Sequence, residues 1–387
     1  MSVAPASPFR IVLAGVIAMA AGMGFGRFVY TPILPAMMEQ LDLSASDMGL
    51  IASSNYLGYL LGAIFAAGGW AAGRERALML AALAANAVLL AAMALTENVI
   101  AFVLIRLLAG IASAFVMIFL TATIYARLAS MRRDDLQGRH FSGVGLGIAS
   151  SSIVTGMTIG MGSGWSVPWL WSAAVSLVVL MLVALMIPRQ PGAVSAKRRE
   201  SPLPKSLPLT LVIVAYGLFG LGYIVTATFF IAIVRATGTE GHLESYVWFA
   251  TGLAGLLSVW FWAKVAARIG LVTAYVVGCL VEAAGVIISV AVGGSVALIV
   301  AGILFGGTFI AITALGLQIG RQLSPEAPRR VLAIMTASFG IGQIIGPVVA
   351  GFMADWTGDF ILPSVGAGLI LVASGALVLA ARPAVTK

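Results

Sequence analysis

The stretch Gly24-Phe25-Gly26-Arg27 begins a pattern that returns about 196 residues later, at Gly220-Leu221-Gly222-Tyr223. At the same offset Gly110 falls on Gly306, and six long apolar segments in the first half of the chain correspond to six in the second. A twofold repeat of membrane spans is typical of secondary transporters, which bind their substrate between the repeats near the middle of the bilayer. The repeat therefore predicts an all-α membrane protein with twelve transmembrane helices in two pseudo-symmetric six-helix bundles.

The composition favours the same class of protein. Hydrophobic residues make up 61% of the chain and charged residues 9%, whereas soluble proteins average roughly 45–50% and 25%. A helix needs roughly 20 apolar residues to cross the hydrocarbon core. On this basis we expect transmembrane helices near residues 10–36, 47–69, 77–95, 98–126, 140–162, 168–188, 209–235, 246–267, 271–292, 296–319, 331–353 and 361–381.

The basic residues predict how the chain is oriented, because Lys and Arg are enriched in cytoplasmic loops. Basic residues gather at both ends of the chain and in the even-numbered loops: Arg10, Arg74, Arg76, Arg127, Arg132, Arg133, Arg139, Arg189, Lys197, Arg198, Arg199, Lys205, Lys264, Arg268, Arg321, Arg329, Arg330, Arg382 and Lys387. The opposite loops hold Arg235 and these acidic residues: Glu39, Asp42, Asp47, Glu97, Glu240, Glu244, Asp355 and Asp359. We expect both termini to be cytoplasmic in a bacterial-type inner membrane. The net charge of +8 then reflects topology and not nucleic-acid binding.

The longest polar stretch, residues 189–208, separates the two halves. Its four prolines disfavour a helix, and its five basic residues are expected to hold it at the cytoplasmic surface. The sequence therefore predicts an N-terminal bundle over residues 1–188, a linker over 189–208 and a C-terminal bundle over 209–387.

Metal and disulfide chemistry is not expected. Cys279 is the single cysteine and lies within a predicted span, which excludes a disulfide framework and a cysteine-based metal site. His140 and His242 lie in or beside loops, without a second ligand at a metal-binding spacing. We therefore predict neither a metal nor a cofactor.

Three stretches carry a family resemblance. They are Gly24-Phe25-Gly26-Arg27-Phe28-Val29-Tyr30-Thr31-Pro32-Ile33-Leu34-Pro35, Arg106-Leu107-Leu108-Ala109-Gly110, and Gly342-Gln343-Ile344-Ile345-Gly346-Pro347 with Gly351-Phe352-Met353-Ala354-Asp355. The chain resembles the major facilitator superfamily over nearly its whole length, and the first stretch looks like that of the YbfB/YjiJ-type branch. The second stretch is similar to the Arg-x-x-x-Gly signature of the fourth helix in that superfamily, and the third resembles its eleventh helix.

The resemblance implies a role for each helix. Helices 1, 4, 7 and 10 should line a central cavity, helices 2, 5, 8 and 11 should form the moving contact between the bundles, and the other four should support them from outside. Two loops depart from the family pattern, because Gly73 and Ala267 stand where the signature usually has Asp. The charge lock that these loops form in many relatives is therefore not expected here.

Three charged residues lie inside predicted spans: Arg27, Arg106 and Glu282. A charge there costs about 2.5 to 17 kcal/mol depending on the method, so it normally faces a wet cavity or a partner. Arg27 and Arg106 lie at matching depth in helices 1 and 4, and a guanidinium offers a planar fork that pairs with a carboxylate or phosphate. The two arginines therefore predict a clamp for a small organic anion.

Two other interpretations of this pair stay open. In one, Arg106 braces helix packing through backbone carbonyls, while Arg27 reaches the membrane surface or pairs with Glu39 or Asp42. In the other, the arginines serve proton coupling without touching the substrate.

The cores of helices 1, 4, 7 and 10 contain no Asp or Glu. A transporter of lipophilic cations would be expected to place a carboxylate in its cavity to offset their desolvation. The absence favours an anionic or zwitterionic substrate. Glu282, in helix 9, is the candidate for proton coupling, and the alternative is a neutral side chain that hydrogen-bonds to a neighbouring helix.

Neutral polar side chains, glycines and prolines within the predicted spans give further expectations. Further candidate contacts to the substrate are Tyr30, Tyr56, Tyr59, Tyr223 and Gln343, each of which can also be satisfied by a neighbouring helix. Glycines at 143–147 and 340–342 are expected to let helices 5 and 11 approach their neighbours closely. Pro32 and Pro35 are expected to kink or end helix 1.

An intramembrane enzyme would need a nucleophile with a base, paired carboxylates or a metal cluster, and the predicted spans contain none of these. We therefore predict that the protein is not an enzyme. The prediction is a secondary active transporter that moves a small organic anion, most simply a carboxylate, by alternating access with proton coupling or anion exchange. The alternative is a proton-coupled efflux pump for hydrophobic or drug-like compounds. We expect the substrate, the lipid bilayer and protons as partners, and a monomer.

Overall fold

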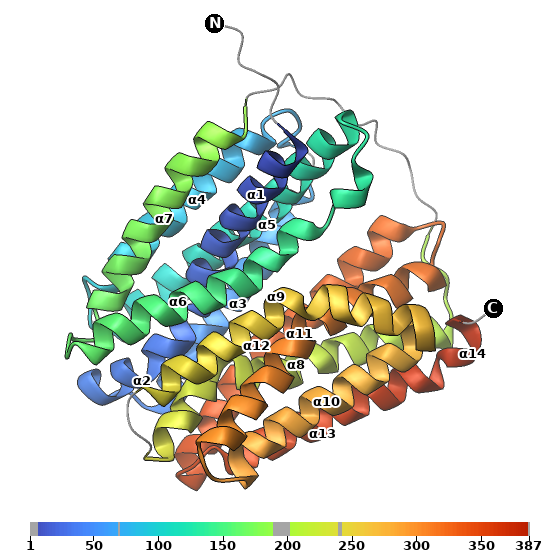
Figure 1. The fold of residues 1–387 in the computed structure, drawn as a ribbon. Helices are drawn as coiled ribbons and strands as arrows, with labels where there is room; N and C mark the ends of the chain where they lie inside the picture. Colours follow the sequence, from blue (N-terminus) through green and yellow to red (C-terminus); the bar gives the residue numbers. More distant parts are fainter. Residues whose placement is uncertain (1–6, 69, 189–201, 239–241, 386–387) are drawn as a thin grey trace, which may run out of the picture.

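The computed structural model describes residues 7–68, 70–188, 202–238 and 242–385 (Figure 1). Within these ranges the chain forms helices and contains no strand. Twelve helical segments are long and apolar enough to cross a membrane. The predicted all-α fold with twelve spans is therefore confirmed, and the protein is a multi-pass membrane protein.

Each half of the chain supplies six of these spans. The first half comprises α1 (Pro8–Met19), η1 (Ala20–Phe28), α2 (Tyr30–Leu41), α3 (Ala45–Ala66), α4 (Glu75–Met93), α5 (Val99–Ser130), η2 (Asp134–Leu136), η3 (Arg139–Ser142), α6 (Gly143–Gly160) and α7 (Val167–Met186). The second half comprises α8 (Leu207–Ala236), α9 (Leu243–Ile269), α10 (Leu271–Ala291), α11 (Ser295–Leu323), α12 (Pro328–Thr357), α13 (Ile361–Ala380) and the short α14 (Arg382–Val385). Residues 189–201 of the predicted linker lie outside the described residues.

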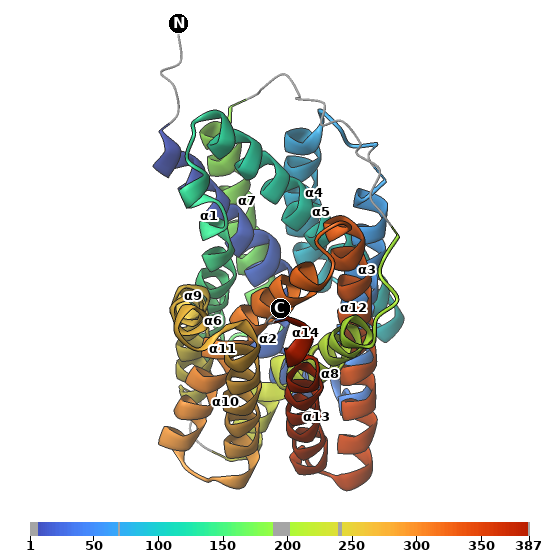
Figure 2. The same cartoon turned by 90° about the vertical axis from the view of Figure 1, so that its right-hand side faces the viewer.

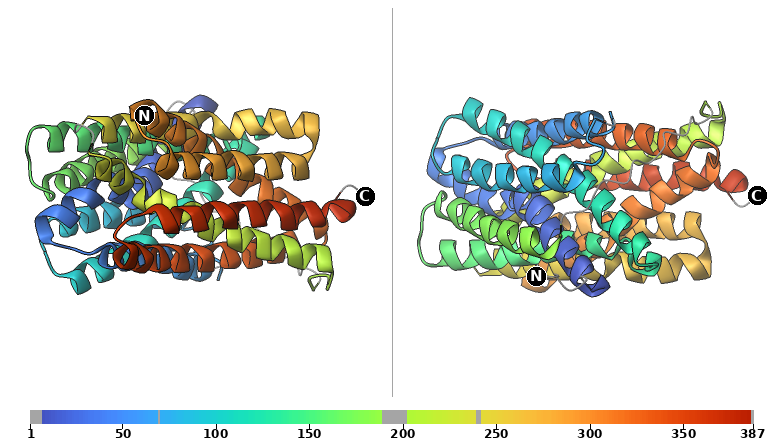
Figure 3. Two further views of the ribbon diagram at one scale, coloured as in Figure 1. Left: turned by 90° about the horizontal axis from the view of Figure 1, so that it is seen from below. Right: turned by 90° about the horizontal axis from the view of Figure 1, so that it is seen from above.

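The two halves form two bundles, which lie side by side in Figures 1 and 2. Seen from below and above, the blue-to-green half occupies one end of the molecule, the yellow-to-red half occupies the other, and the two overlap in the middle (Figure 3). We call the side on which α1 begins and α13 ends the terminal side. The opposite side, with the loops that follow α2, α8 and α12, is the far side.

The first span differs from its predicted form. It runs from Pro8 to Leu41 and changes in its middle from an α-helix to the π-helix η1. There the Val29 amide donates to the Gly24 carbonyl at 2.9 Å, one residue further back than in an α-helix. The prediction that Pro35 could end this helix is wrong, because α2 continues past it to Leu41.

Two helix pairs make the main contact between the bundles: α3 with α12, and α6 with α9. In chain order these are spans 2 and 11, and spans 5 and 8, the pairs expected to form the moving contact. Glycine lets their backbones approach closely. A Cβ atom at Gly49 would lie 2.2 Å from the carbonyl oxygen of Pro347, and one at Gly145 would lie 2.2 Å from the amide nitrogen of Leu256. The predicted role of the glycines in helix 5 is thereby confirmed at Gly145.

On the far side, a carboxylate from one bundle binds the end of a helix in the other. Asp355, near the end of α12, accepts hydrogen bonds from the amides of Ala45 and Ser46 at 2.9 Å each, and also from the Ser46 hydroxyl. These amides open α3, and the first amides of a helix have no partner within it. The contact therefore combines charge-assisted hydrogen bonds with a favourable position on the helix dipole.

A second far-side contact uses Arg235, the basic residue among the acidic loops of that side. Its Nη1 donates to Glu39 of the other bundle at 3.0 Å, and its Nε donates to Glu244 at 2.7 Å. Deeper in the molecule, the Thr31 hydroxyl donates to the Ala227 carbonyl at 2.5 Å, again between the bundles. These contacts close the far side of the interface.

We predict that Asp355→Asn loosens this closure. The amide loses the charge and one of the two acceptor oxygens, which costs about 1 kcal/mol at such an exposed helix terminus. A cysteine placed at the buried Ala227, with Cys279 replaced by Ala, should then react faster with a bulky maleimide.

Asp359→Asn is the matched control, because the Asp359 carboxylate accepts the amide of Ile361 in its own bundle. An equal labelling rate in Asp355→Asn and in the parent protein would contradict the assignment of Asp355 to the closure.

Candidate functional site

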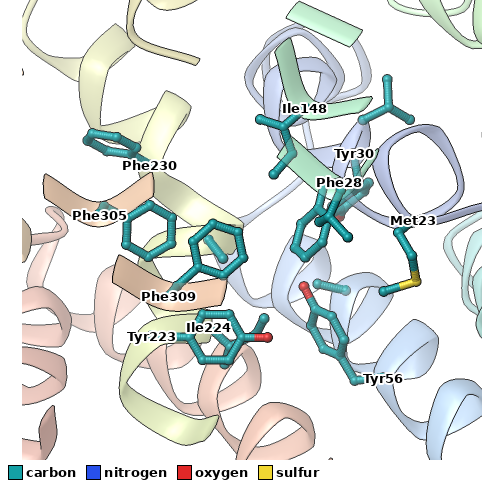
Figure 4. Close-up of a cluster of buried hydrophobic side chains, with 14 of the residues drawn as sticks. Met23, Phe28, Tyr30, Tyr56, Ile148, Tyr223, Ile224, Phe230, Phe305 and Phe309 are labelled. Carbon is teal, nitrogen blue, oxygen red and sulfur yellow. The ribbon is translucent and has the colours of Figure 1, made fainter. Parts of the chain in front are cut away.

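The predicted site residues meet where the two bundles face each other. Arg27 and Arg106 are buried, with 5% and 1% of their surface exposed. Tyr56 and Tyr59 of α3 lie beside Arg27, while Tyr223 of α8 and Gln343 of α12 belong to the opposite bundle. In Figure 4 the Tyr223 hydroxyl points across the interface toward Tyr56. The structure thus gathers side chains from five helical spans.

Arg106 of α5 is committed to the backbone of the first span. Its Nη1 donates to the Gly26 carbonyl at 3.1 Å and its Nη2 donates to the Arg27 carbonyl at 3.0 Å. The guanidinium also lies 5.1 Å from the centre of the Tyr30 ring. The change from π- to α-helix and the missing N–H of Pro32 disturb the backbone hydrogen bonding at this point, so carbonyls are left for a side-chain donor.

This geometry corrects the prediction of a two-arginine clamp. Both terminal nitrogens of Arg106 are used by backbone carbonyls, so its fork is not available to a carboxylate in this arrangement. Arg106 instead follows the bracing interpretation. Two further hydrogen bonds hold the brace: the Asn55 amide donates to the Arg106 carbonyl at 2.9 Å, and the Tyr30 hydroxyl donates to the Met48 carbonyl at 2.9 Å. Tyr30 is therefore also occupied by the protein.

Arg27 has a different environment. Its guanidinium carbon lies 4.2 Å from the centre of the Tyr59 ring and 5.0 Å from that of Tyr56. Its Nε and Nη2 atoms are buried and have no hydrogen-bond partner among the residues that the structure describes. The interpretation in which Arg27 pairs with Glu39 is wrong for this structure, because the Glu39 carboxylate accepts from Arg235. Arg27 therefore offers unpaired donors in the middle of the protein.

Aromatic rings of the second bundle lie opposite this guanidinium. Tyr223 is nearly parallel to Phe309 of α11 and to Phe339 of α12, with ring centres 5.8 and 5.4 Å apart. The Gln343 amide donates to the Tyr223 hydroxyl. Phe28, next to Arg27, meets Phe309 edge to face with the centres 6.0 Å apart, and so bridges the bundles.

The phenylalanines of this group were not among the predicted site residues. A Phe in an apolar helix has no signal that separates it from ordinary packing. The expectation that span 10 lines the centre would have pointed to α11 but not to Phe309 on it.

Glu282 lies apart from the arginines, on α10. It is fully buried between helices, and neither carboxylate oxygen is within hydrogen-bonding geometry of a donor. The Thr308 hydroxyl of α11 is the polar group beside it, but this hydroxyl donates to the Leu304 carbonyl at 2.7 Å. An unpaired carboxyl in such surroundings is accommodated most easily when neutral.

Between α6 and α9 the surface has an open groove of about 530 Å³. Met157, Met161 and Phe249 give it an apolar lining, and His242 and Ser245 are its polar members. Neither arginine lines it. Within the described residues, no group of three or more His, Cys, Asp or Glu side chains is arranged to hold a metal ion.

We predict that Arg106→Lys destabilises the protein. A lysine keeps the charge but cannot reach two carbonyls with a planar fork, and a lost hydrogen bond to a charged group costs about 1.5–3 kcal/mol. Unfolding of the detergent-purified protein, followed by temperature or denaturant, measures the effect.

Arg27→Lys is the matched control, since the two buried nitrogens described above donate no hydrogen bond and little stability should be lost. Equal unfolding curves for the two variants would refute the bracing role of Arg106.

Comparison with known proteins places the chain in a family. Residues 19–379 match the family described as "Uncharacterised MFS-type transporter YbfB". The chain is 23% identical over 365 residues to the "Uncharacterized MFS-type transporter YceJ" of Bacillus subtilis (strain 168), covering 87% of this chain and 88% of that protein.

Solved structures of the nucleoside transporter NupG have a similar fold. A point mutant of NupG superimposes with a TM-score of 0.78 at 16% identity, covering 97% of this chain and 99% of that one. A second NupG structure gives a TM-score of 0.71, also at 16% identity, covering 98% and 99%. Together with the match over residues 19–379, the twelve spans in two bundles establish that this chain belongs to the YbfB-type family of major facilitator transporters.

Proposed function

We propose that the protein is a secondary active transporter for a small organic anion, most simply a carboxylate, which binds Arg27 between the two bundles. The bundles would rock about the contacts of α3 with α12 and of α6 with α9. By the distribution of basic residues, the terminal side is cytoplasmic and the membrane is a bacterial-type inner membrane. The transporter would work as a monomer.

The unpaired donors of Arg27 are the observation that carries this proposal. A guanidinium keeps its positive charge under all ordinary conditions, and burying it without an anionic partner is expensive. The aromatic faces of Tyr56 and Tyr59 offset part of this cost by cation–π attraction, but they fill none of the N–H donors. A carboxylate that accepts from Nε and Nη2 in a bidentate pair would satisfy both donors and the charge.

The role of Arg106 supports the same site. By holding the carbonyls of Gly26 and Arg27, it fixes the backbone from which the Arg27 side chain projects. Arg106 is thus a positioning residue, and its own charge adds to the positive potential at the centre. The far-side closure by Asp355 and Arg235 suits a state that exchanges its substrate through the terminal side.

We predict that Arg27→Gln reduces carboxylate uptake into proteoliposomes by about 100-fold or more, because it removes the charge that pairs with the substrate. Arg27→Lys keeps a charge but not the planar fork. Carboxylate uptake by Arg27→Lys should therefore fall about tenfold, which is equivalent to the loss of one hydrogen bond to a charged group. Uptake of radiolabelled carboxylates from a small panel measures both effects.

Thermal unfolding of the same samples serves as the control, since neither Arg27 variant should be less stable than the parent protein. Undiminished carboxylate transport by Arg27→Gln would overturn the proposed function.

Glu282 is the proposed proton carrier, because a buried carboxyl without a fixed partner can take up and release a proton as its access to water changes. We predict that Glu282→Gln abolishes accumulation driven by a pH gradient but keeps exchange of labelled for unlabelled anion. Glu97→Gln, at an exposed loop position, is the control. Gradient-driven accumulation by Glu282→Gln would instead assign proton coupling to another group, and its absence in the parent protein would assign the protein to anion exchange.

Two other substrates have a specific observation in their favour. The open apolar groove between α6 and α9 suits export of hydrophobic compounds. The Tyr223 and Gln343 pair suits a neutral, flat substrate such as the nucleosides named for NupG. Arg27→Gln separates these from the proposal, because transport of a hydrophobic compound or a nucleoside should survive the loss of the guanidinium.

A further inference from the structure

Aromatic rings surround the donors of Arg27 in an arrangement that the anion site alone does not require. Tyr223 lies in a stack that combines three helices. Its ring is inclined by 19° to Phe219, by 8° to Phe309 and by 12° to Phe339, with ring centres 5.3 to 5.8 Å apart. Phe305 continues the row beyond Phe309 at 5.2 Å and 10°. Figure 4 shows Phe305, Phe309 and Tyr223 as a row that faces Phe28 and Tyr56.

Aromatic pairs in proteins adopt both offset-stacked and edge-to-face geometries. Here the rings of Phe305, Phe309, Tyr223 and Phe339, contributed by α8, α11 and α12, lie within 12° of their neighbours in the row, so their faces share one orientation. Arg27 repeats the pattern on the other side, because its guanidinium lies over the rings of Tyr59 and Tyr56. The interface therefore combines one positive charge with aligned aromatic faces.

The two sets of rings touch through Phe28 and Phe309. Phe28 follows Arg27 directly in the chain, and its ring meets Phe309 at 66° across the boundary of the bundles. Both side chains are buried, with 4% and 5% of their surface exposed. The Phe28 ring thus occupies the position that a second flat ring would take against Phe309. This position lies within reach of Arg27.

We propose that the anion carried by this protein is an aromatic carboxylate, whose ring takes the place of the Phe28 ring against Phe309, beside Tyr223, while its carboxylate pairs with Arg27. The inference rests on the proposed function, because it needs Arg27 as the anion site. The Tyr223 hydroxyl and the Gln343 amide lie at the rim of the stack, where they suit a hydroxyl or ring nitrogen on the substrate. An aliphatic anion would leave the ring faces without a flat partner.

Benzoate and cyclohexanecarboxylate test the proposal, since they have the same charge and nearly the same size but differ in the flat ring. Binding of each compound is measured by its competition with the uptake of a radiolabelled carboxylate. Thermal stabilisation of the detergent-purified protein measures it independently. Benzoate should bind about tenfold more tightly than cyclohexanecarboxylate, the equivalent of a favourable aromatic pair. Phe309→Leu should bring this ratio close to one.

Phe229→Leu is the matched control, because Phe229 is a fully buried phenylalanine of α8 that contacts Phe360 instead of the stack. Phe229→Leu should destabilise the protein about as much as Phe309→Leu does. It should leave the ratio of benzoate to cyclohexanecarboxylate binding unchanged. If Phe309→Leu fails to fold, Tyr223→Leu replaces it, with the same expected loss of preference, because Tyr223 is the other ring of the stack that the substrate would contact.

The outcomes distinguish this inference from the proposed function. Equal binding of benzoate and cyclohexanecarboxylate, lost in both cases on Arg27→Gln, would overturn the aromatic preference and leave the anion site standing. Binding of both probes that survives Arg27→Gln would overturn the anion site itself. Failure of benzoate to bind the unmodified protein would overturn the inference directly.

Discussion

The centre of this protein depends on two hydrogen bonds, which the Arg106 guanidinium donates to the carbonyls of Gly26 and Arg27. A π-helix in the middle of a membrane span leaves backbone groups that water cannot satisfy there, so another helix has to supply the donors. Arg106 supplies two from one planar group, and α5 is thereby fixed to the first span. The same contact sets the direction in which Arg27 leaves its backbone.

Arg106 and Arg27 belong to the same bundle but have different roles. Arg106 has protein partners for both terminal nitrogens, whereas the Nε and Nη2 atoms of Arg27 have none. Arg106 keeps one buried, unpaired donor, its Nε, but the backbone holds both of its terminal nitrogens. On Arg27 the whole fork of Nε and Nη2 lacks a partner, and a buried charge with a free fork indicates a ligand. The proposed anion site follows from this difference and not from the mere presence of two charges in the spans.

The interface between the bundles contains two kinds of contact. Glycines such as Gly49 and Gly145 bring the backbones together without side chains between them. On the far side, Asp355 and Arg235 add polar contacts that have to break before that side opens. The proposed alternating access needs both kinds of contact: close glycine contacts in the middle of the interface and polar contacts that hold one side closed. The row that contains Tyr223 and Phe309 lies across the interface from Phe28 and Tyr56, the neighbours of Arg27 (Figure 4).

The amino-acid sequence by itself determined the class of this protein, because twelve apolar segments in two similar halves allow few folds in a bilayer. It also identified Arg27 and Arg106, since a charge inside a span is conspicuous in sequence. It could not assign their roles, which depend on whether a donor meets a carbonyl or has no hydrogen-bond partner. The tertiary structure alone decided that Arg106 is a brace and that Phe28, beside Arg27, meets Phe309, because both follow from contacts between helices far apart in the chain. It also showed that α2 continues past Pro35.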